Sequence, residues 1–176
     1  MNALANEQVG EYVAAQFVAA YQKVGTFQKN GNTKNGGNVA SYFCRPDGTV
    51  LHVVPGPVDG DTFLREARWA VDVDQATALE AGDDVFAQKL HLRRAHAVRY
   101  FAEHRGRAGA TKPLRSLVPD DVDARMPKAL PNGVGPLGQA HWLLWSDPLP
   151  KLAAVYKTVW RDILKERVTD EPVRGR

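Results

Sequence analysis

The stretch "GGNVASYFCRPDGTVLHVVPG", residues 36–56, decides the fold that this chain is expected to adopt. Two runs rich in β-branched and aromatic residues lie on either side of a short turn. In that turn Pro46 fixes its own φ near the required value, and Gly48 can take a positive φ. The stretch therefore predicts an antiparallel β-hairpin.

The segments around the hairpin predict further elements of both kinds. Apolar residues recur at near-helical spacing over 3–16, and both parities of 17–25 are largely apolar, so we expect a helix and then a buried strand. Residues 28–37 contain two Asn-Gly pairs and predict a loop. After the hairpin, an acidic N-cap at Asp59 or Asp61 favours the start of a helix.

The second half of the chain is predicted to be helical. Helices are expected over 83–104, 135–145 and 146–167, with an irregular stretch rich in Gly and Pro over 105–135. The expected fold class is therefore α/β, with a C-terminal extension that is all helical.

The order of these elements resembles the thioredoxin fold. In that family a strand, a Pro-Asp-Gly turn, a second strand, a glycine and a helix with Phe-Leu near its start often follow one another. The matching segments here are residues 39–43, 46–48 and 50–54, Gly56, and residues 63–64. The resemblance implies a thioredoxin-like sheet near the N-terminus of the chain.

The resemblance implies a division of the chain into three parts. We expect a thioredoxin-like domain over 1–75, a helical extension over 76–168 and a frayed tail over 169–176. The aligned sheet lacks its first strand, which would lie upstream of Met1.

Two departures from the family bear on activity. The redox centre of the family is Cys-x-x-Cys, which needs two thiols, and this chain has one cysteine, Cys44. The motif would fall at or just upstream of Met1. The family's cis-proline position corresponds to Val39, where a trans peptide bond is expected because a non-proline cis bond costs about 2.5–4 kcal/mol.

These departures leave two hypotheses about function. The first is a thioredoxin-like protein without its own redox centre, acting as a protein-interaction module, in which case the chain as given is not catalytic. The second is a thiol–disulfide oxidoreductase whose first strand and Cys-x-x-Cys lie upstream. A protein partner fits the first hypothesis, and a homo-oligomer stays open because the apolar face over 152–164 needs cover.

Cys44 is the candidate reactive thiol of the sequence. Thiolate formation is favoured by a helix N-terminus or a nearby cation, and Arg45 is adjacent. Neighbouring strand residues point to opposite faces, however. We therefore expect Cys44 to be a small packing residue and assign no catalytic residue.

The histidines do not show a metal-ligand spacing. His91 and His96 are five residues apart, which places them about 140° apart on a helix, and His96 and His104 are two turns apart. His141 lies among aromatic residues and is expected to be a packed core histidine. No metal ligand and no cofactor-binding residue is predicted, since phosphate-binding glycine motifs are also absent from the sequence.

A cluster of basic residues offers a patch for an acidic partner. Its members precede and follow two aromatic residues of the 83–104 helix: Lys89, Arg93, Arg94, Arg99, Arg105 and Arg107. A solvated helix face is the simpler interpretation, and a net charge of +3 is too small to predict nucleic-acid binding.

The remaining composition favours an ordinary globular chain. Apolar residues make up 44% of its 176 residues and charged residues 24%. No apolar run approaches the roughly 18 residues of a membrane span, and the N-terminus has no basic region of a signal peptide. A soluble, cytoplasmic protein is expected, unless an upstream segment changes this localisation.

Overall fold

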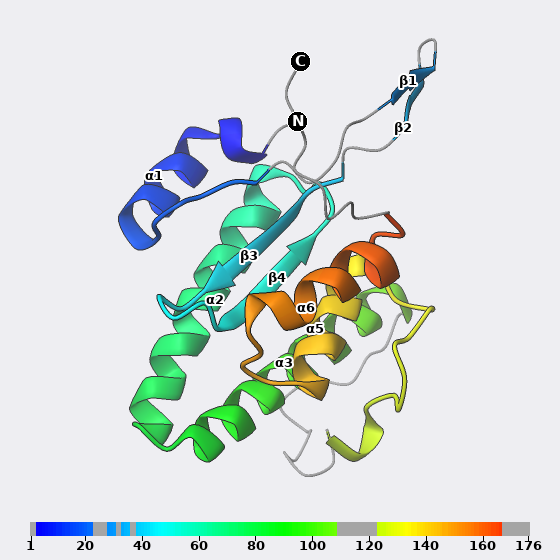
Figure 1. The fold of residues 1–176 in the computed structure, drawn as a ribbon. Helices are drawn as coiled ribbons and strands as arrows, with labels where there is room; N and C mark the ends of the chain where they lie inside the picture. The colour runs from blue at the N-terminus through cyan, green and yellow to red at the C-terminus, as the bar shows by residue number, and fades with distance from the viewer. Residues whose placement is uncertain (1–2, 23–27, 31–32, 36–37, 109–122, 167–176) are drawn as a thin grey trace.

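A two-stranded antiparallel sheet lies between the helices of the protein, and its strands are β3 (Ala40–Cys44) and β4 (Val50–Pro55) (Figure 1). The structure is a computed structural model that describes residues 3–22, 28–30, 33–35, 38–108 and 123–166. The fold is mixed α/β and mostly helical. The predicted hairpin is confirmed.

The turn of this hairpin forms for the reasons that its sequence indicated. Gly48 has a φ of 78°, which is costly for any residue with a side chain. Asp47 accepts hydrogen bonds from the backbone N–H and the hydroxyl of Thr49, at 2.9 and 2.8 Å. Lys151 donates to the same carboxylate from the far end of the chain, so the turn is also a tertiary contact.

The N-terminal region departs from the expected strand. A 3₁₀ turn, η1 (Ala3–Ala5), leads into α1 (Glu7–Gln16), whose first turn is capped by Asn6. Residues 17–22 then form no strand, with Val18 and Tyr21 102% and 98% exposed. A strand needs a hydrogen-bonding neighbour, and within the described part of the chain β3 pairs with β4 alone. The prediction for these residues was wrong for that reason.

The predicted loop over 28–37 contains a short second hairpin instead. Its strands are β1 (Gln28–Asn30) and β2 (Thr33–Asn35), which pair antiparallel. Asn-Gly between two short runs is a hairpin signal as well as a loop signal.

The helices surround the central hairpin on both faces (Figure 1). The predicted helices are confirmed in position, but the one expected over 146–167 begins at Leu152 and becomes π-helical after Thr158. They are α2 (Gly60–Ala81), α3 (Val85–Ala108), α5 (Pro136–Ser146), α6 (Leu152–Thr158) and the π-helical turn η3 (Val159–Ile163).

All residues of β4 are buried because apolar clusters cover both faces of the hairpin. On one face, residues of α1 and α2 pack on β3 and β4 around Phe43, Val54 and Phe63. On the other face, residues of α5, α6 and η3 pack around Val50 and Val53. A residue at the middle of β4 is therefore buried by side chains on both faces of the hairpin.

The helical half is packed against the hairpin rather than set apart from it. The predicted boundary between residues 75 and 76 falls inside α2. Beyond the end of α5, Pro150 accepts a hydrogen bond from the N–H of Val50, and Leu152 donates one to Gly48. The larger thioredoxin-like sheet stays a prediction, since the described residues contain no third strand beside β3 and β4.

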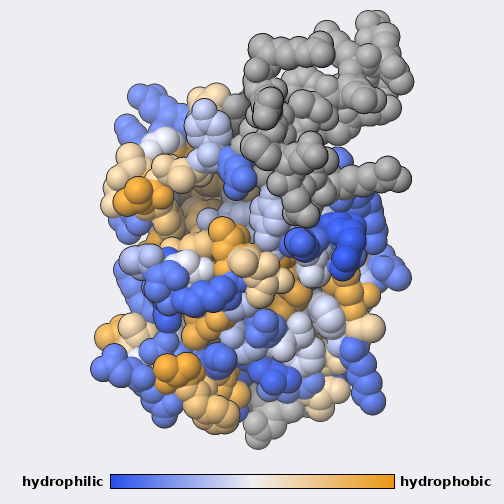
Figure 2. All heavy atoms as spheres, in the orientation of Figure 1, coloured by the Kyte–Doolittle hydropathy of each residue, from blue (hydrophilic) through white to orange (hydrophobic). Residues whose placement is uncertain are grey.

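The surface shows hydrophilic side chains with small hydrophobic groups between them on the face drawn in Figure 2. Among the described residues, no helix has the length and apolar character that crossing a membrane requires.

Candidate metal centre

Three histidines from three different elements meet in the interior. His52 lies on β4, His96 on α3 and His141 on α5. One ring nitrogen from each lies within 4.8 Å of the others, and the side chains are buried. The ring centroids are 4.8 Å apart for His52 and His141, and 5.2 Å apart for His96 and His141. We call these three residues the histidine cluster.

Each histidine occupies a buried position at which the neighbouring residues of its strand or helix would predict an apolar side chain. His52 stands in an unbroken run of buried β4 residues. His96 lies between the buried Leu92 and Tyr100 on one face of α3, and His141 lies one turn before the buried Leu144 on α5. Burial of the apolar residues of β4, α3 and α5 thus brings the three imidazole rings together.

A buried carboxylate fixes the proton on His52. Glu66 of α2 is fully buried, and its Oε2 lies 3.1 Å from His52 Nε2. Arg99 of α3 donates from Nη2 to the same carboxylate. An ionised carboxylate only accepts hydrogen bonds, so Nε2 of His52 carries the proton and Nδ1 keeps its lone pair. This is the arrangement that orients metal-binding histidines in proteins.

A backbone carbonyl fixes the proton on His96 in the same way. His96 Nε2 lies 3.0 Å from the oxygen of Leu51, and a carbonyl can only accept, so Nε2 donates. The lone pair of His96 is then on Nδ1, which lies 2.9 Å from Nδ1 of His141. His141 donates to it, and its own lone pair is on Nε2.

The environment keeps the cluster neutral and the carboxylate charged. Burial lowers the pKa of His96 to about 3, with further lowering by His52 and Arg99, and burial also lowers the pKa of His52 and His141. Burial by itself would raise the pKa of Glu66, but hydrogen bonds from His52 and Arg99 outweigh it and lower that pKa to about 2. Neutral imidazoles with lone pairs are the form that binds metal ions.

Two nitrogens of the cluster are buried without a hydrogen-bond partner among the described residues. They are His52 Nδ1 and His141 Nε2, the same two atoms to which the proton assignment gives lone pairs. A buried polar atom without a partner costs about 1–3 kcal/mol. A packed structural cluster would be expected to satisfy these atoms, whereas a ligand-binding cluster leaves them for the ligand.

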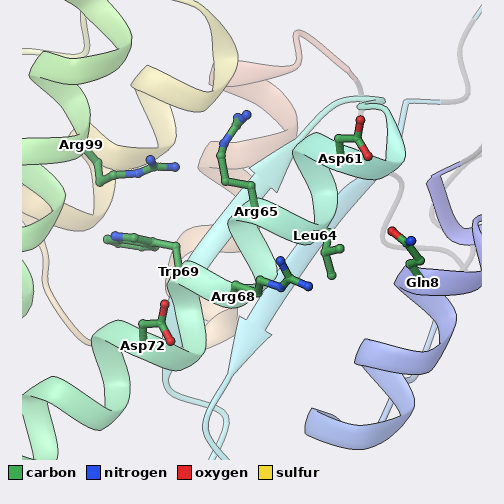
Figure 3. A pocket seen from close by; sticks show the side chains of 8 residues that line it. All are labelled: Gln8, Asp61, Leu64, Arg65, Arg68, Trp69, Asp72 and Arg99. Carbon is green, nitrogen blue, oxygen red and sulfur yellow. The ribbon is translucent and has the colours of Figure 1, made fainter.

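One aromatic side chain separates the histidine cluster from a surface pocket. The ring of Trp69 on α2 lies 4.9, 5.0 and 5.2 Å from the rings of His52, His96 and His141. Trp69 also lines a pocket of about 530 Å³ together with Arg99, and Figure 3 shows both side chains at one end of it. Trp69 and Arg99 therefore face the cluster on one side and the pocket on the other.

The structure places the predicted thiol away from this centre. Cys44 ends β3, is partly buried and packs with the apolar cluster around Val50 and Val53. Burial and then Asp47 raise the pKa of the thiol, which disfavours the thiolate. Val39, at the family's cis-proline position, is 43% exposed, and all peptide bonds of the described residues are trans.

The predicted basic patch is divided among separate contacts. Arg99 binds the buried Glu66, and Arg93 lies 3.4 Å from Asp123 and over the ring of Trp145. Arg94 also has an interaction partner, and Lys89 is exposed. The side chains of Arg105 and Arg107 lie outside the described residues. At least Arg93 and Arg99 thus have roles within the fold.

Spacing along a single helix does not reveal this cluster, because its three histidines come from β4, α3 and α5. The three histidines are 44 and 45 residues apart along the chain, so no local spacing relates them. The available signal was a polar residue at a core position, seen for His52 in "TVLHVV" and for Glu66 on the apolar face of its helix. No known protein family, curated protein or solved structure matches the chain in comparisons of all three kinds.

Proposed function

We propose that this protein binds one divalent transition-metal ion through His52, His96 and His141. The observation that carries the proposal is the set of ring nitrogens within 4.8 Å of one another in a buried site. Two of the rings have their second nitrogen held by an acceptor, Glu66 or the Leu51 carbonyl. Such outer contacts set the lone pair for a metal.

The donor set selects the class of metal. Three imidazoles suit Zn²⁺, Cu²⁺, Ni²⁺ or Co²⁺, whereas Mg²⁺ and Ca²⁺ require oxygen ligands. The cluster includes no thiolate, which disfavours Cu⁺. Zn²⁺ is the ion that we assign to the site.

Binding requires a small rearrangement of the rings. Nitrogens of a tetrahedral zinc site lie about 3.3 Å apart, given zinc–nitrogen bonds of about 2.0–2.1 Å. The widest separation in the cluster is 4.8 Å, and His96 Nδ1 lies 2.9 Å from His141 Nδ1. The ion thus replaces the hydrogen bond between two rings and draws the third ring inward.

The direct test is metal titration of protein freed of metal by a chelator and dialysed. We expect one Zn²⁺ or Co²⁺ per chain by elemental analysis after gel filtration. A saturating ion at 100 times its dissociation constant adds about 2.7 kcal/mol, which corresponds to a melting-temperature rise of roughly 5–10 °C. The fluorescence of Trp69 should change with the same stoichiometry, and Trp69→Phe should remove that change.

Matched variants on one helix separate this site from adventitious binding. His96→Gln should lower the affinity at least 100-fold, while His91→Gln should leave it unchanged, because His91 lies on the same helix but contacts Thr77 and Glu80. If His96→Gln does not fold, paramagnetic shifts of the histidine ring protons in Co²⁺-loaded wild-type protein serve instead. Equal binding by both variants, or no shifted histidine signals, would overturn the proposal.

The hypotheses from the resemblance remain as a second proposal. A thioredoxin-like protein-interaction module without a redox centre is favoured by the segment over 17–22, which has no regular secondary structure and exposes Val18 and Tyr21. An insulin-reduction assay on this chain is expected to be blank. Activity there would instead assign a redox role to Cys44 and contradict this proposal. The alternative oxidoreductase requires a Cys-x-x-Cys encoded in frame upstream of Met1.

A further inference from the structure

We infer that the metal ion in the histidine cluster takes its fourth ligand from solution, and that this ligand is a small anion that enters past Trp69 and Arg99. The inference rests on the proposed metal site. It adds a ligand class and a route, which make the site open rather than purely structural.

The count of donors leaves one coordination position for an outside ligand. The group of side chains near enough to share an ion consists of His52, His96 and His141 among the described residues. The nearest carboxylate, Glu66, is occupied by His52 and Arg99. Structural zinc sites have four protein ligands, whereas sites with three keep the fourth position for water or substrate.

The charge of the site favours an anion in that position. The three imidazoles are neutral, and the charges of Glu66 and Arg99 cancel, so a divalent ion brings a net charge of +2 into the interior. A buried charge without a counter-charge is strongly unfavourable. Hydroxide from bound water, azide or the carboxylate of a small molecule lowers that charge.

The pocket next to the cluster supplies the route and presents guanidinium groups to an anion. Its lining includes three arginines, Arg65, Arg68 and Arg99, and two aspartates, Asp61 and Asp72. Because Arg99 is paired with Glu66, the formal charges of the other four charged lining residues balance. The guanidinium groups still offer hydrogen-bond donors to an anion. A volume of about 530 Å³ is in the range of small-molecule sites.

The barrier between pocket and cluster is one layer of side chains. Arg99 lies with its guanidinium 5.5 Å from the ring centre of Trp69, and Figure 3 shows the two side chains next to each other. Trp69 is partly exposed while the three histidines behind it are buried. A rotation of the Trp69 side chain is the shortest way to open the cluster.

The test uses the Co²⁺-loaded protein, whose visible absorption reports the coordination of the metal. We expect azide and acetate each to change the spectrum saturably, with one anion per cobalt, and to have no effect on metal-free protein. Trp69→Ala should speed the approach to this new spectrum at least several-fold. If Trp69→Ala does not fold, the same comparison uses Trp69→Phe.

A charge-matched pair of variants tests the pocket as the route. Arg68→Gln should lower the association rate of azide by about 2–5-fold at low salt, since fixed charges near a site steer anions. Arg161 is an exposed arginine that pairs with its neighbour Asp162 in η3 and does not line the pocket. Arg161→Gln should therefore leave the rate unchanged. Cobalt binding with a spectrum insensitive to both anions would overturn this inference and leave the metal site standing. Absence of cobalt binding would instead overturn the proposed function.

Discussion

Glu66 shows how much one residue decides in this interior. It is a charged side chain with no exposed surface, and it lies on the apolar face of α2. Two arginines contact it: Arg99, whose side chain is 21% exposed, and Arg65, whose side chain is 53% exposed. The contrast in exposure predicts that the two contacts differ in their contribution to stability.

Replacement of each arginine by glutamine tests this difference. Arg99→Gln should lower the free energy of unfolding by about 2–4 kcal/mol, because it leaves a buried carboxylate without its main counter-charge. Arg65→Gln should change it by no more than about 0.5 kcal/mol, as for other exposed ion pairs. Urea unfolding of metal-free protein measures both, and equal effects would mean that the Glu66–Arg99 pair contributes no more than a surface contact.

At this scale the sequence indicated little of the candidate site. Histidine and glutamate are usually found at the protein surface. Here they are buried because elements that are far apart in the sequence pack against one another. The basic cluster was visible in the sequence, but Arg99 was grouped with its neighbours because its partner, Glu66, lies 33 residues away. Periodicity finds a face of a helix and cannot say which other element covers that face.

At the scale of elements, the turn of the β3–β4 hairpin was predictable because its residues act locally. Gly48 has a φ of 78°, and a Cβ there would meet no other atom within 4 Å. Any cost of a substitution is therefore a cost of backbone conformation. Gly10 in α1 also has open space around it, at an ordinary helical φ.

Alanine at these two glycines should have opposite effects. Gly48→Ala should destabilise the protein by about 1–2 kcal/mol because the left-handed conformation is unfavourable for L-residues. Gly10→Ala should stabilise it by about 0.5–1 kcal/mol, since alanine loses less entropy on entering a helix. Thermal unfolding of both variants beside the wild type is the measurement, and a stabilised Gly48→Ala would show that the turn does not hold the described conformation.

Other elements depended on partners that the sequence did not reveal. The apolar residues over 17–22 have the composition of a strand but no strand beside them in the described structure. The helices α2 and α3 were found because their apolar stripes are long and Asp59 and Asp84 cap their first turns locally. Helices, whose backbone hydrogen bonds lie within the element, were thus predicted better than strands, whose backbone hydrogen bonds need a neighbouring strand.

At the scale of the whole molecule, the buried histidines connect stability to pH. Burial holds the pKa of His96 near 3 in the folded protein, against an ordinary value of 6.5. At pH values between these two pKa values, His96 is protonated in the unfolded chain but not in the folded protein. The free energy of unfolding therefore falls as the pH falls. His52 and His141 act in the same direction, and Glu66, whose pKa is also lowered, adds to the loss only below its ordinary value of 4.5.

The metal-free protein is therefore expected to lose stability between pH 7 and pH 5. The His96 contribution at pH 5 is about 2 kcal/mol, from 1.36 kcal/mol for each unit below 6.5. Urea midpoints at half-unit pH intervals measure this loss, and recovery of the midpoint after return to pH 7 excludes chemical damage. A constant midpoint over this range would show that the histidines are not held neutral.

The hydrogen bond from His96 to the Leu51 carbonyl has a consequence for self-assembly. Together with the bond from Val50 N–H to Pro150, it engages two backbone groups at the start of β4, while β3 pairs with no strand other than β4 among the described residues. A sheet with two open edges can polymerise without end, whereas one open edge permits a single joining event. Two copies that met through β3 would complete a four-stranded sheet, and growth would stop at the pair.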